Sequence, residues 1–208
     1  EMNRKLIKTA FVRTIPVLTG YIVLGIGFGI LLEKNGFGVP WAFAMSLLIY
    51  AGSMQYVAVG LLSSGASLVS AALAALMVNA RHLFYGISMV DRYRNAGRKK
   101  PYLIFALTDE TYSLVCTDDI PEGADPNTYH LLVSAMNQCY WVAGSVLGSI
   151  LGAALPFDST GIDFAMTALF VTVFVSQWIS TENHIPALTG LLATALCLVL
   201  FGSEHFLI

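Results

Sequence analysis

An arginine and a histidine stand side by side within one of the most apolar stretches of the chain. Arg81 and His82 belong to the segment Asn79-Ala80-Arg81-His82-Leu83-Phe84-Tyr85-Gly86, inside an apolar run from about residue 66 to residue 90. A guanidinium at the centre of a membrane helix costs roughly 2.5–3.5 kcal/mol on insertion scales, and it is tolerated where it faces protein or water. The segment therefore predicts a polar site within the hydrophobic part of the protein.

Two carboxylates interrupt the next apolar run. Arg81 precedes Asp91 by ten residues, and Asp109, which Glu110 follows, comes nine residues after Lys100. In helical geometry both side chains then lie about 13–15 Å from the loop between the two runs. If the runs form a hairpin about that loop, Arg81 and Asp109 lie at nearly one depth. Each would supply the counter-charge of the other and lower the cost of burying both.

Two interpretations of this group remain open. As a structural pair, Arg81 and Asp109 would only fix the register of two helices. With His82 and Glu110, however, the group holds more titratable side chains than one ion pair needs. A histidine and a spare carboxylate in one site can pass protons, so this interpretation predicts a proton relay.

Uncharged polar side chains also fall within the apolar runs, where they either hydrogen-bond across helices or contact a ligand. The candidates for ligand binding are Ser53, Gln55, Asn79, Tyr85 and Asn137. His130 lies near the end of a run and is expected at the membrane interface. The four histidines and three cysteines show no metal-ligand spacing, so neither a metal nor a cofactor is expected.

The composition predicts an all-α polytopic membrane protein. Of the 208 residues, 56% are hydrophobic and only 12% are charged, and the mean hydropathy is +0.71. A soluble domain carries about 25% charged residues. We expect a single transmembrane domain over residues 1–208, embedded in the lipid bilayer and without a nucleic-acid partner. The expected hydrophobic segments, about seven, are 14–32, 40–62, 66–90, 101–116, 128–155, 163–180 and 186–201.

The positive charges predict the topology of the first half. All 11 lysines and arginines lie at or before Lys100, and residues 91–100 form a strongly basic loop. By the positive-inside rule this loop and the basic N-terminal segment are both cytoplasmic. Three full crossings between them would place them on opposite sides. We therefore expect the run 40–62 to be re-entrant, as two half-helices broken near Gly52.

Glycine spacing predicts close contacts between helices. The glycines in question are Gly25 and Gly29, which form G-x-x-x-G, and Gly144, Gly148 and Gly152, which repeat every four residues. Such spacing lets helix backbones approach closely. Glycine crowding near Pro16 also permits a locally unwound first helix, of the kind transporters use at binding sites.

An inverted repeat is a further hypothesis, because transporters often contain one. The two halves that flank the basic loop both carry a glutamine followed by an aromatic residue within an apolar run. These are Gln55-Tyr56 and Gln138-Cys139-Tyr140.

Four motifs, taken in order, resemble signatures of the AzlC family, the large subunit of branched-chain amino-acid exporters. They are Ala51-Gly52-Ser53-Met54-Gln55, Asn79-Ala80-Arg81-His82-Leu83-Phe84-Tyr85-Gly86, Thr108-Asp109-Glu110-Thr111 and Gly161-Ile162-Asp163-Phe164-Ala165. The resemblance implies a multi-pass protein of the bacterial cytoplasmic (inner) membrane that works with a small hydrophobic AzlD-type subunit. It also implies export of leucine, isoleucine, valine and their analogues, as an antiporter driven by the proton gradient.

Such a transporter would need three kinds of contact with a zwitterionic, aliphatic substrate. The substrate carboxylate needs Arg81 or backbone N–H groups at a helix break, for which Ser53 is the candidate position. Its ammonium group needs Asp109 or Glu110. Proton coupling needs a group at which proton and substrate compete, and we expect Glu110, His82 or Asp109 in that role.

Two alternatives from other classes stay open at this point. The chain could be a channel or scaffold subunit of a membrane complex. It could also be an intramembrane enzyme that uses His82 and Asp109 as an acid–base pair. The chain has neither a G-x-S-x-G nucleophile turn nor an H-E-x-x-H metal pair, so we do not expect an enzyme.

Overall fold

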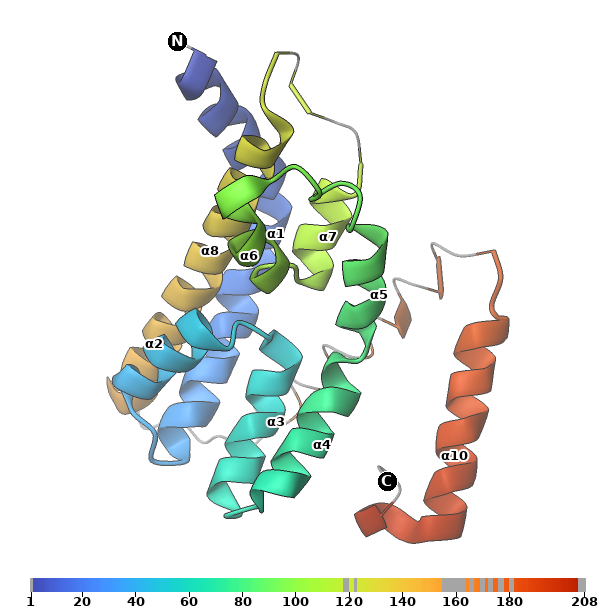
Figure 1. The fold of residues 1–208 in the computed structure, drawn as a ribbon. Helices are drawn as coiled ribbons and strands as arrows, with labels where there is room; N and C mark the ends of the chain where they lie inside the picture. Colours follow the sequence, from blue (N-terminus) through green and yellow to red (C-terminus); the bar gives the residue numbers. More distant parts are fainter. Residues whose placement is uncertain are drawn as a thin grey trace. The chain divides into compact units, whose positions relative to one another are not determined.

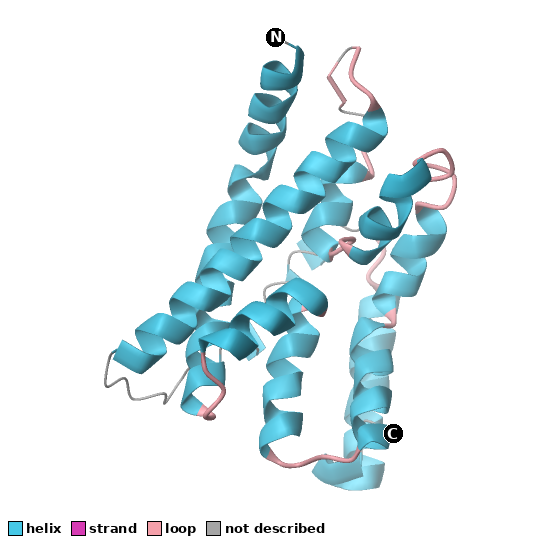
Figure 2. Ribbon diagram, turned by 60° about the vertical axis from the view of Figure 1, so that its left-hand side comes forward, coloured by secondary structure: helices cyan, strands magenta, loops and turns pink. Residues whose placement is uncertain are grey.

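The computed structural model describes residues 2–117, 120–121, 123–154, 164, 167–168, 171, 174–175, 178–179 and 182–205. All regular structure within these residues is helical, which confirms the expected all-α class (Figure 2). Contacts divide the chain into two compact units, Glu1–Ile162 and Asp163–Ile208. The expected segment 163–180 lies largely outside the described residues.

Two long helices of the first unit pack side by side (Figure 1). They are α1, Met2–Lys34, and α8, Pro126–Ala154. The contacts between them follow the same sequence direction along both helices: Thr14 contacts Met136, and further along Glu33 contacts Ser149. The two helices are therefore parallel. α1 runs through Pro16 without interruption, so the alternative of a locally unwound first helix is wrong.

Glycines make the close contact between α1 and α8 possible. A Cβ atom added at Gly25 would lie 2.9 Å from the backbone nitrogen of Ser145, and one added at Gly29 would overlap the backbone oxygen of the same residue. On the other helix, a Cβ at Gly148 would overlap the backbone oxygen of Ile26. The predicted small-residue packing is confirmed, and any larger side chain at these positions would separate the helices.

The run 40–62 forms a hairpin of two short helices, the first hairpin. Its helices are α2, Val39–Leu48, and α3, Gly52–Ser63. Tyr50 in the turn has φ +46°, a left-handed backbone conformation that a tyrosine rarely adopts. At the other end, Ser63 Oγ donates to Asn35 Oδ1 at 2.8 Å, so the hairpin returns to the end of the unit that it left. The break lies where the sequence predicted it.

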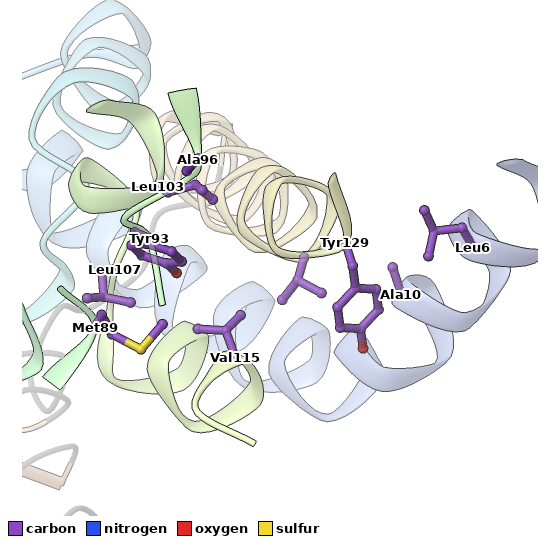
Figure 3. Packing of buried hydrophobic residues seen from close by; sticks show 10 residues of the cluster. Leu6, Ala10, Met89, Tyr93, Ala96, Leu103, Leu107, Val115 and Tyr129 are labelled. Carbon is purple, nitrogen blue, oxygen red and sulfur yellow. The ribbon is translucent and has the colours of Figure 1, made fainter. Parts of the chain in front are cut away.

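After the first hairpin, a broken helix leads back to the end of the unit where the chain starts. It consists of α4, Leu68–Asn79, and α5, Arg81–Ser88, which meet at an angle of 50°. Tyr93, just beyond α5, packs in one cluster with Leu6 and Ala10 of α1 (Figure 3). The N-terminal segment and the basic loop therefore lie at the same end of the unit, hereafter the basic end. Because the first hairpin doubles back instead of crossing the unit, the two basic segments can lie on the same side, which resolves the conflict that three full crossings would create.

A second hairpin starts and ends at the basic end. It contains the short 3₁₀ helix η1, Gly97–Lys99, then α6, Lys100–Phe105, and α7, Asp109–Val115. The Arg92 guanidinium donates to the backbone oxygen of Cys116 at 3.0 Å, which fixes the end of α7 beside the loop that precedes α6. The chain thus twice forms a helical segment followed by a hairpin. The first time it is α1 with α2 and α3, and the second time, in the opposite direction, it is the broken helix of α4 and α5 with α6 and α7 (Figure 1).

The glutamines proposed as markers of a repeat do not occupy equivalent places. Gln55 lies in the second half-helix of the first hairpin, whereas Gln138 lies in the long helix α8. The inverted repeat stays a prediction. Near their turns, the two hairpins touch through Tyr50 and Phe105, whose ring centroids are 6.2 Å apart.

Among the described residues, the stretch Arg4–Lys34 is long and apolar enough to cross a membrane, and α4 with α5 would add a second span if the bent pair is one span. The count of seven segments stays a prediction. In the second unit, α10 spans Ile185–His205. His184 stacks on Trp178 just before it, with ring centroids 4.0 Å apart.

Candidate functional site

Three helix breaks meet at the guanidinium of Arg81. Arg81 opens α5, and its Nη1 lies 2.8 Å from Asp109 Oδ2 at the start of α7. Its Nη2 donates to Ser53 Oγ at 2.9 Å in the first turn of α3. The structure thus joins the predicted pair of Arg81 and Asp109 and adds Ser53 to it. One side chain holds together the first turns of two half-helices that come from opposite ends of the unit.

Helix N-termini and a carboxylate surround the Arg81 guanidinium. The first turn of a helix leaves backbone N–H groups unpaired and carries a partial positive charge. The N-termini of α3 and α5 both lie at Arg81, and Asp109 supplies the carboxylate that faces the guanidinium. Arg81 Nε and Asp109 Oδ1 are buried and have no hydrogen-bond partner. The pair therefore retains one donor and one acceptor with which to bind a further group.

Glu110 occupies a different environment from its neighbour Asp109. Tyr21 Oη in α1 donates to Glu110 Oε2 at 2.7 Å and lies equally close to Thr108 Oγ1. No ion pair of Glu110 is found in the part of the chain that the structure describes. One carboxylate is thus paired with a cation, and the adjacent one is held by a phenol. Sequence reasoning missed Tyr21, because a single hydroxyl group in an apolar segment carries no distinctive pattern, and it gave Thr108 no role although this residue opens the third motif.

Asn137 is connected to the Glu110 group through threonines. Its Nδ2 donates to Thr111 Oγ1 at 3.0 Å, and Thr111 Oγ1 accepts a hydrogen bond of 3.0 Å from Thr108 Oγ1. Asn137 Oδ1 is buried without a partner. Asn137 therefore lies within the group around Glu110, and its predicted contact with a ligand stays a prediction.

Gln55 lies away from this group and uses its whole amide in packing. Its Nε2 donates to Ser46 Oγ at 3.2 Å, and its Oε1 accepts from Trp141 Nε1 at 2.9 Å. The side chain is fully buried. These contacts give Gln55 the role of an interhelical hydrogen bond, the alternative that the sequence had left open.

A cavity of about 390 Å³ lies beside the Arg81 group, between the turn of the first hairpin, the broken helix and α6. Most of its lining is apolar, and its polar groups include Tyr50, Asn79 and His82. Arg81 and Asp109 are not part of the lining. The predicted residues therefore divide into an ionic group and a cavity that meet at the break between α4 and α5.

Tyr85 also lies next to this region, and its ring stacks on that of Tyr112 in the second hairpin with centroids 4.6 Å apart. On its other side it meets His82 edge to face at 5.9 Å. Within the described residues, no cluster of histidine, cysteine, aspartate or glutamate has the arrangement of a metal site.

A comparison with known protein families decides the family. The model described as "AzlC protein" matches residues 16–155, which include the first three of the four motifs. This chain belongs to the AzlC family. The fourth motif, residues 161–165, lies beyond the matched region and almost wholly outside the described residues.

Relatives of this AzlC-family chain are named as membrane proteins. It is 44% identical to the "Branched-chain amino acid transport protein AzlC" of Bacillus subtilis (strain 168), over 97% of this chain and 79% of the relative. It is 43% identical to an uncharacterised membrane protein of Helicobacter pylori (strain ATCC 700392 / 26695), over 98% and 90%. It is 27% identical to the "Inner membrane protein YgaZ" of Escherichia coli (strain K12), over 86% and 77%. No solved structure matches the chain.

Proposed function

We propose that this chain is the transporting subunit of a proton-coupled exporter of branched-chain amino acids. The observation that carries the proposal is the meeting of three helix breaks at Arg81, with Asp109 and Ser53 as its partners. Discontinuous helices with charged groups at their breaks are typical of substrate sites in secondary transporters. The family supports transport, and the name of the Bacillus subtilis relative supports the choice of substrate.

The ionic group suits the two charges of an amino acid. A substrate carboxylate would bind the Arg81 guanidinium and the N–H groups at the start of α3, where the helix N-terminus adds a partial positive charge. The ammonium group would bind Asp109, whose Oδ1 has no protein partner. Substrate would thus enter between two groups that neutralise each other when it is absent. This exchange of partners limits the cost of leaving either charge unpaired.

The adjacent cavity suits the aliphatic side chain of the substrate. Its lining includes Leu83, Ile104 and Phe105, which would remove a branched chain from water. Asn79 and His82 lie on the side of the cavity formed by the broken helix. Its volume of about 390 Å³ falls within the range of about 300–1,000 Å³ typical of small-molecule sites.

The two hairpins would provide access from opposite sides. Each has a turn within the unit, and Gln138 of α8 links them, accepting from Tyr102 Oη at 2.7 Å and donating to the Leu47 backbone oxygen at 3.0 Å. Movement of one hairpin against α8 would open the site toward one side while the other stays closed. Alternating access by rigid elements around a fixed site is the general behaviour of such transporters.

Glu110 is our candidate for proton coupling. It lies next to Asp109 in sequence, is bound by Tyr21, and has no cationic partner among the described residues. A negative charge on Glu110 would therefore attract either a proton or the substrate ammonium group, so the two would compete. Asp109 is ion-paired with Arg81 rather than hydrogen-bonded to His82 in the described structure, which favours transport over the enzyme alternative.

A small hydrophobic AzlD-type subunit and the bacterial cytoplasmic membrane complete the proposal. The outer face of α4 exposes large apolar side chains that lipid or such a subunit would cover. These are Leu68, Val69, Leu73, Leu76 and Met77.

Transport of labelled leucine by proteoliposomes tests the proposal. The chain would be reconstituted with and without its small subunit, with and without a pH gradient. We expect leucine to accumulate against its concentration only when the gradient is present, whereas a channel would merely equilibrate it. Asp109→Asn should abolish accumulation while the protein still assembles. Glu182→Gln, at an exposed carboxylate in the second unit, is the control. Normal accumulation by the Asp109 variant would contradict the proposed role of the pair.

A further inference from the structure

Three polar residues on one face of α8 lie buried between the basic end and the Glu110 group. They are His130, Ser134 and Asn137, with exposed fractions of 1%, 0% and 0%. Their spacing of four and three residues places them on the same side of the helix. The sequence predicted an interfacial position for His130. The structure buries its side chain next to Tyr93 of the basic loop, and its depth relative to a membrane stays a prediction.

The side chains of this row leave several polar atoms without protein partners. Both ring nitrogens of His130, the Ser134 hydroxyl and Asn137 Oδ1 are buried and make no hydrogen bond. Buried polar groups are almost always satisfied, and water commonly provides the bond where the protein does not. Four such atoms along about 10 Å of helix therefore indicate a route that water can share.

The inner end of the row connects to Glu110 through a chain of close polar contacts. Asn137 donates to Thr111 at 3.0 Å, and Thr111 accepts from Thr108 at 3.0 Å. Tyr21 Oη lies 2.7 Å from both Thr108 Oγ1 and Glu110 Oε2. Hydroxyl groups can each accept one proton and release another, so this part of the chain of contacts can relay protons.

The outer end of the row lies at the basic end. The charged groups that interact with His130 are Arg92 of the loop after α5 and Asp125 just before α8. The ring of Tyr93 stands edge to face against His130 at 5.8 Å, and Tyr129 lies on its other side at 6.1 Å. Tyr93 and Tyr129 belong in turn to a hydrophobic cluster with members from α1 and α7 (Figure 3). His130 is thus the titratable group between the charged surface and the inner hydroxyls.

We propose that His130, Ser134 and Asn137 form the route by which Glu110 exchanges protons with the side of the membrane that holds the basic loop. The Glu110 carboxyl group releases its proton to the neighbouring hydroxyl group. Each hydroxyl or water then accepts one proton and passes one on, and His130 accepts one and releases one at the basic end. The net result is one proton moved and one carboxylate left. Asn137 is a positioning residue that orients water. The proposal rests on the proposed function and adds a pathway to it.

Two assays on the same proteoliposomes separate this pathway from a structural role. The first measures leucine accumulation driven by a pH gradient. The second measures exchange of labelled for unlabelled leucine at equal pH, which needs binding and conformational change but no net proton movement. For His130→Phe we expect driven accumulation to fall by about tenfold or more, while exchange stays within about twofold of the unmodified protein. His184→Phe, a histidine stacked on Trp178 in the second unit, is the matched control and should change neither.

Ser134→Ala gives a second, smaller change in case the first variant does not assemble. It removes the unpartnered hydroxyl without adding bulk, and it should lower driven accumulation more than exchange. Accumulation within twofold of the unmodified protein in either assembled variant overturns the pathway, as does an equal loss in both assays. If the unmodified protein shows no dependence on the pH gradient, the proposed proton coupling itself is wrong, an outcome visible before any variant is made.

Discussion

The two hairpins have similar shapes and different chemistry. Ala51 precedes α3 without a side-chain cap, and the first turn of that helix presents Ser53. In the second hairpin, Thr108 caps α7 by accepting from the backbone N–H of Thr111, and Asp109 and Glu110 follow at once. The first hairpin therefore offers backbone N–H groups and packing surface, whereas the second offers carboxylates.

The difference indicates a division of labour. Gly52 in the first hairpin packs against the Trp141 ring, where an added Cβ would lie 3.1 Å from the ring, and Gln55 is bonded to the same tryptophan. The turn of this hairpin is fixed by neutral contacts to α8. The second hairpin is held by Arg81 and Tyr21, through groups that a proton or a substrate can displace. We infer that the second hairpin couples transport to protons and that the first shapes the site.

The largest expected effect comes from removing the residue that bonds to both hairpins. Arg81→Met would leave Asp109 without its cation and Ser53 without its donor, so we expect leucine transport to fall by about a hundredfold or more. Arg81→Lys keeps the charge but lacks the planar fork that makes both bonds, and it should recover only part of the activity. Transport assays on purified variants, with monodispersity as the control for assembly, decide this. Full activity of Arg81→Lys would show that charge alone joins the hairpins.

A change in the α1–α8 contact should disturb both hairpins equally. Gly29→Ala places a methyl group against the backbone of Ser145 and Ser149, so we expect a loss of about 1–3 kcal/mol in stability and a lower melting temperature. Gly20→Ala lies on the same helix with no atom within 4 Å of the added Cβ, and it should be tolerated. Thermal unfolding in detergent compares the two. Equal melting temperatures would contradict the close packing of the helices.

A change in the cavity between the hairpins should alter selectivity rather than assembly. Gly86 lines the cavity, and an added Cβ there meets no atom within 4 Å. Gly86→Leu would fill part of the volume, so transport of leucine should fall by about tenfold relative to alanine. Gly60→Leu, also with open space but away from the cavity, is the control. An unchanged ratio of the two substrates would mean that the cavity does not hold the side chain.

The smallest effect concerns how the hairpins are attached at their outer ends. Asp125 binds Lys99 Nζ at 2.9 Å, beside the start of the second hairpin, whereas the first hairpin uses the neutral contact of Ser63 with Asn35. Hydrogen bonds from Thr128 and Lys99 lower the pKa of Asp125 from 3.8 to about 2. Because the folded pKa is the lower one, this small stabilisation is present above about pH 4 and is lost as the pH falls toward 2.

Melting temperatures measured across that range should fall slightly less for Asp125→Asn than for the unmodified protein. Ser63→Ala, at the other hairpin, should not change the pH dependence. The pair is exposed, so its contribution is screened by solvent and the difference should be small. A larger pH effect in the Ser63 variant would show that the two attachments do not differ as described.

Several features of the fold could be predicted from local sequence. The break near Gly52 and the glycine contacts between α1 and α8 follow from residue types whose backbone properties act locally. The same depth of Arg81 and Asp109 follows from the constant rise of a helix and one short loop. The break between α4 and α5 could not be predicted, because no glycine or proline stands between Asn79 and Arg81 to mark it.

The use of each polar group could not be predicted in the same way. Gln55 and Asn137 are equally plausible ligands in sequence, yet one is enclosed by Trp141 and Ser46 and the other reaches Thr111. His130 sits near the start of α8, yet its side chain is buried next to Tyr93 of the basic loop. Such outcomes depend on which helices become neighbours, and that depends on contacts between distant parts of the chain, such as Gln55 with Trp141, 86 residues apart.

The sequence by itself determined the membrane class, the family and the expectation that Arg81 and Asp109 share one depth, because composition, ordered motifs and helical rise are properties of the chain alone. Only the tertiary structure decided that two hairpins from opposite ends bring Ser53 and Asp109 to one guanidinium. It also decided that Glu110 is held by Tyr21 rather than by a cation. Burial and hydrogen bonding arise from packing between distant segments, so the same carboxylate pair could have had either arrangement.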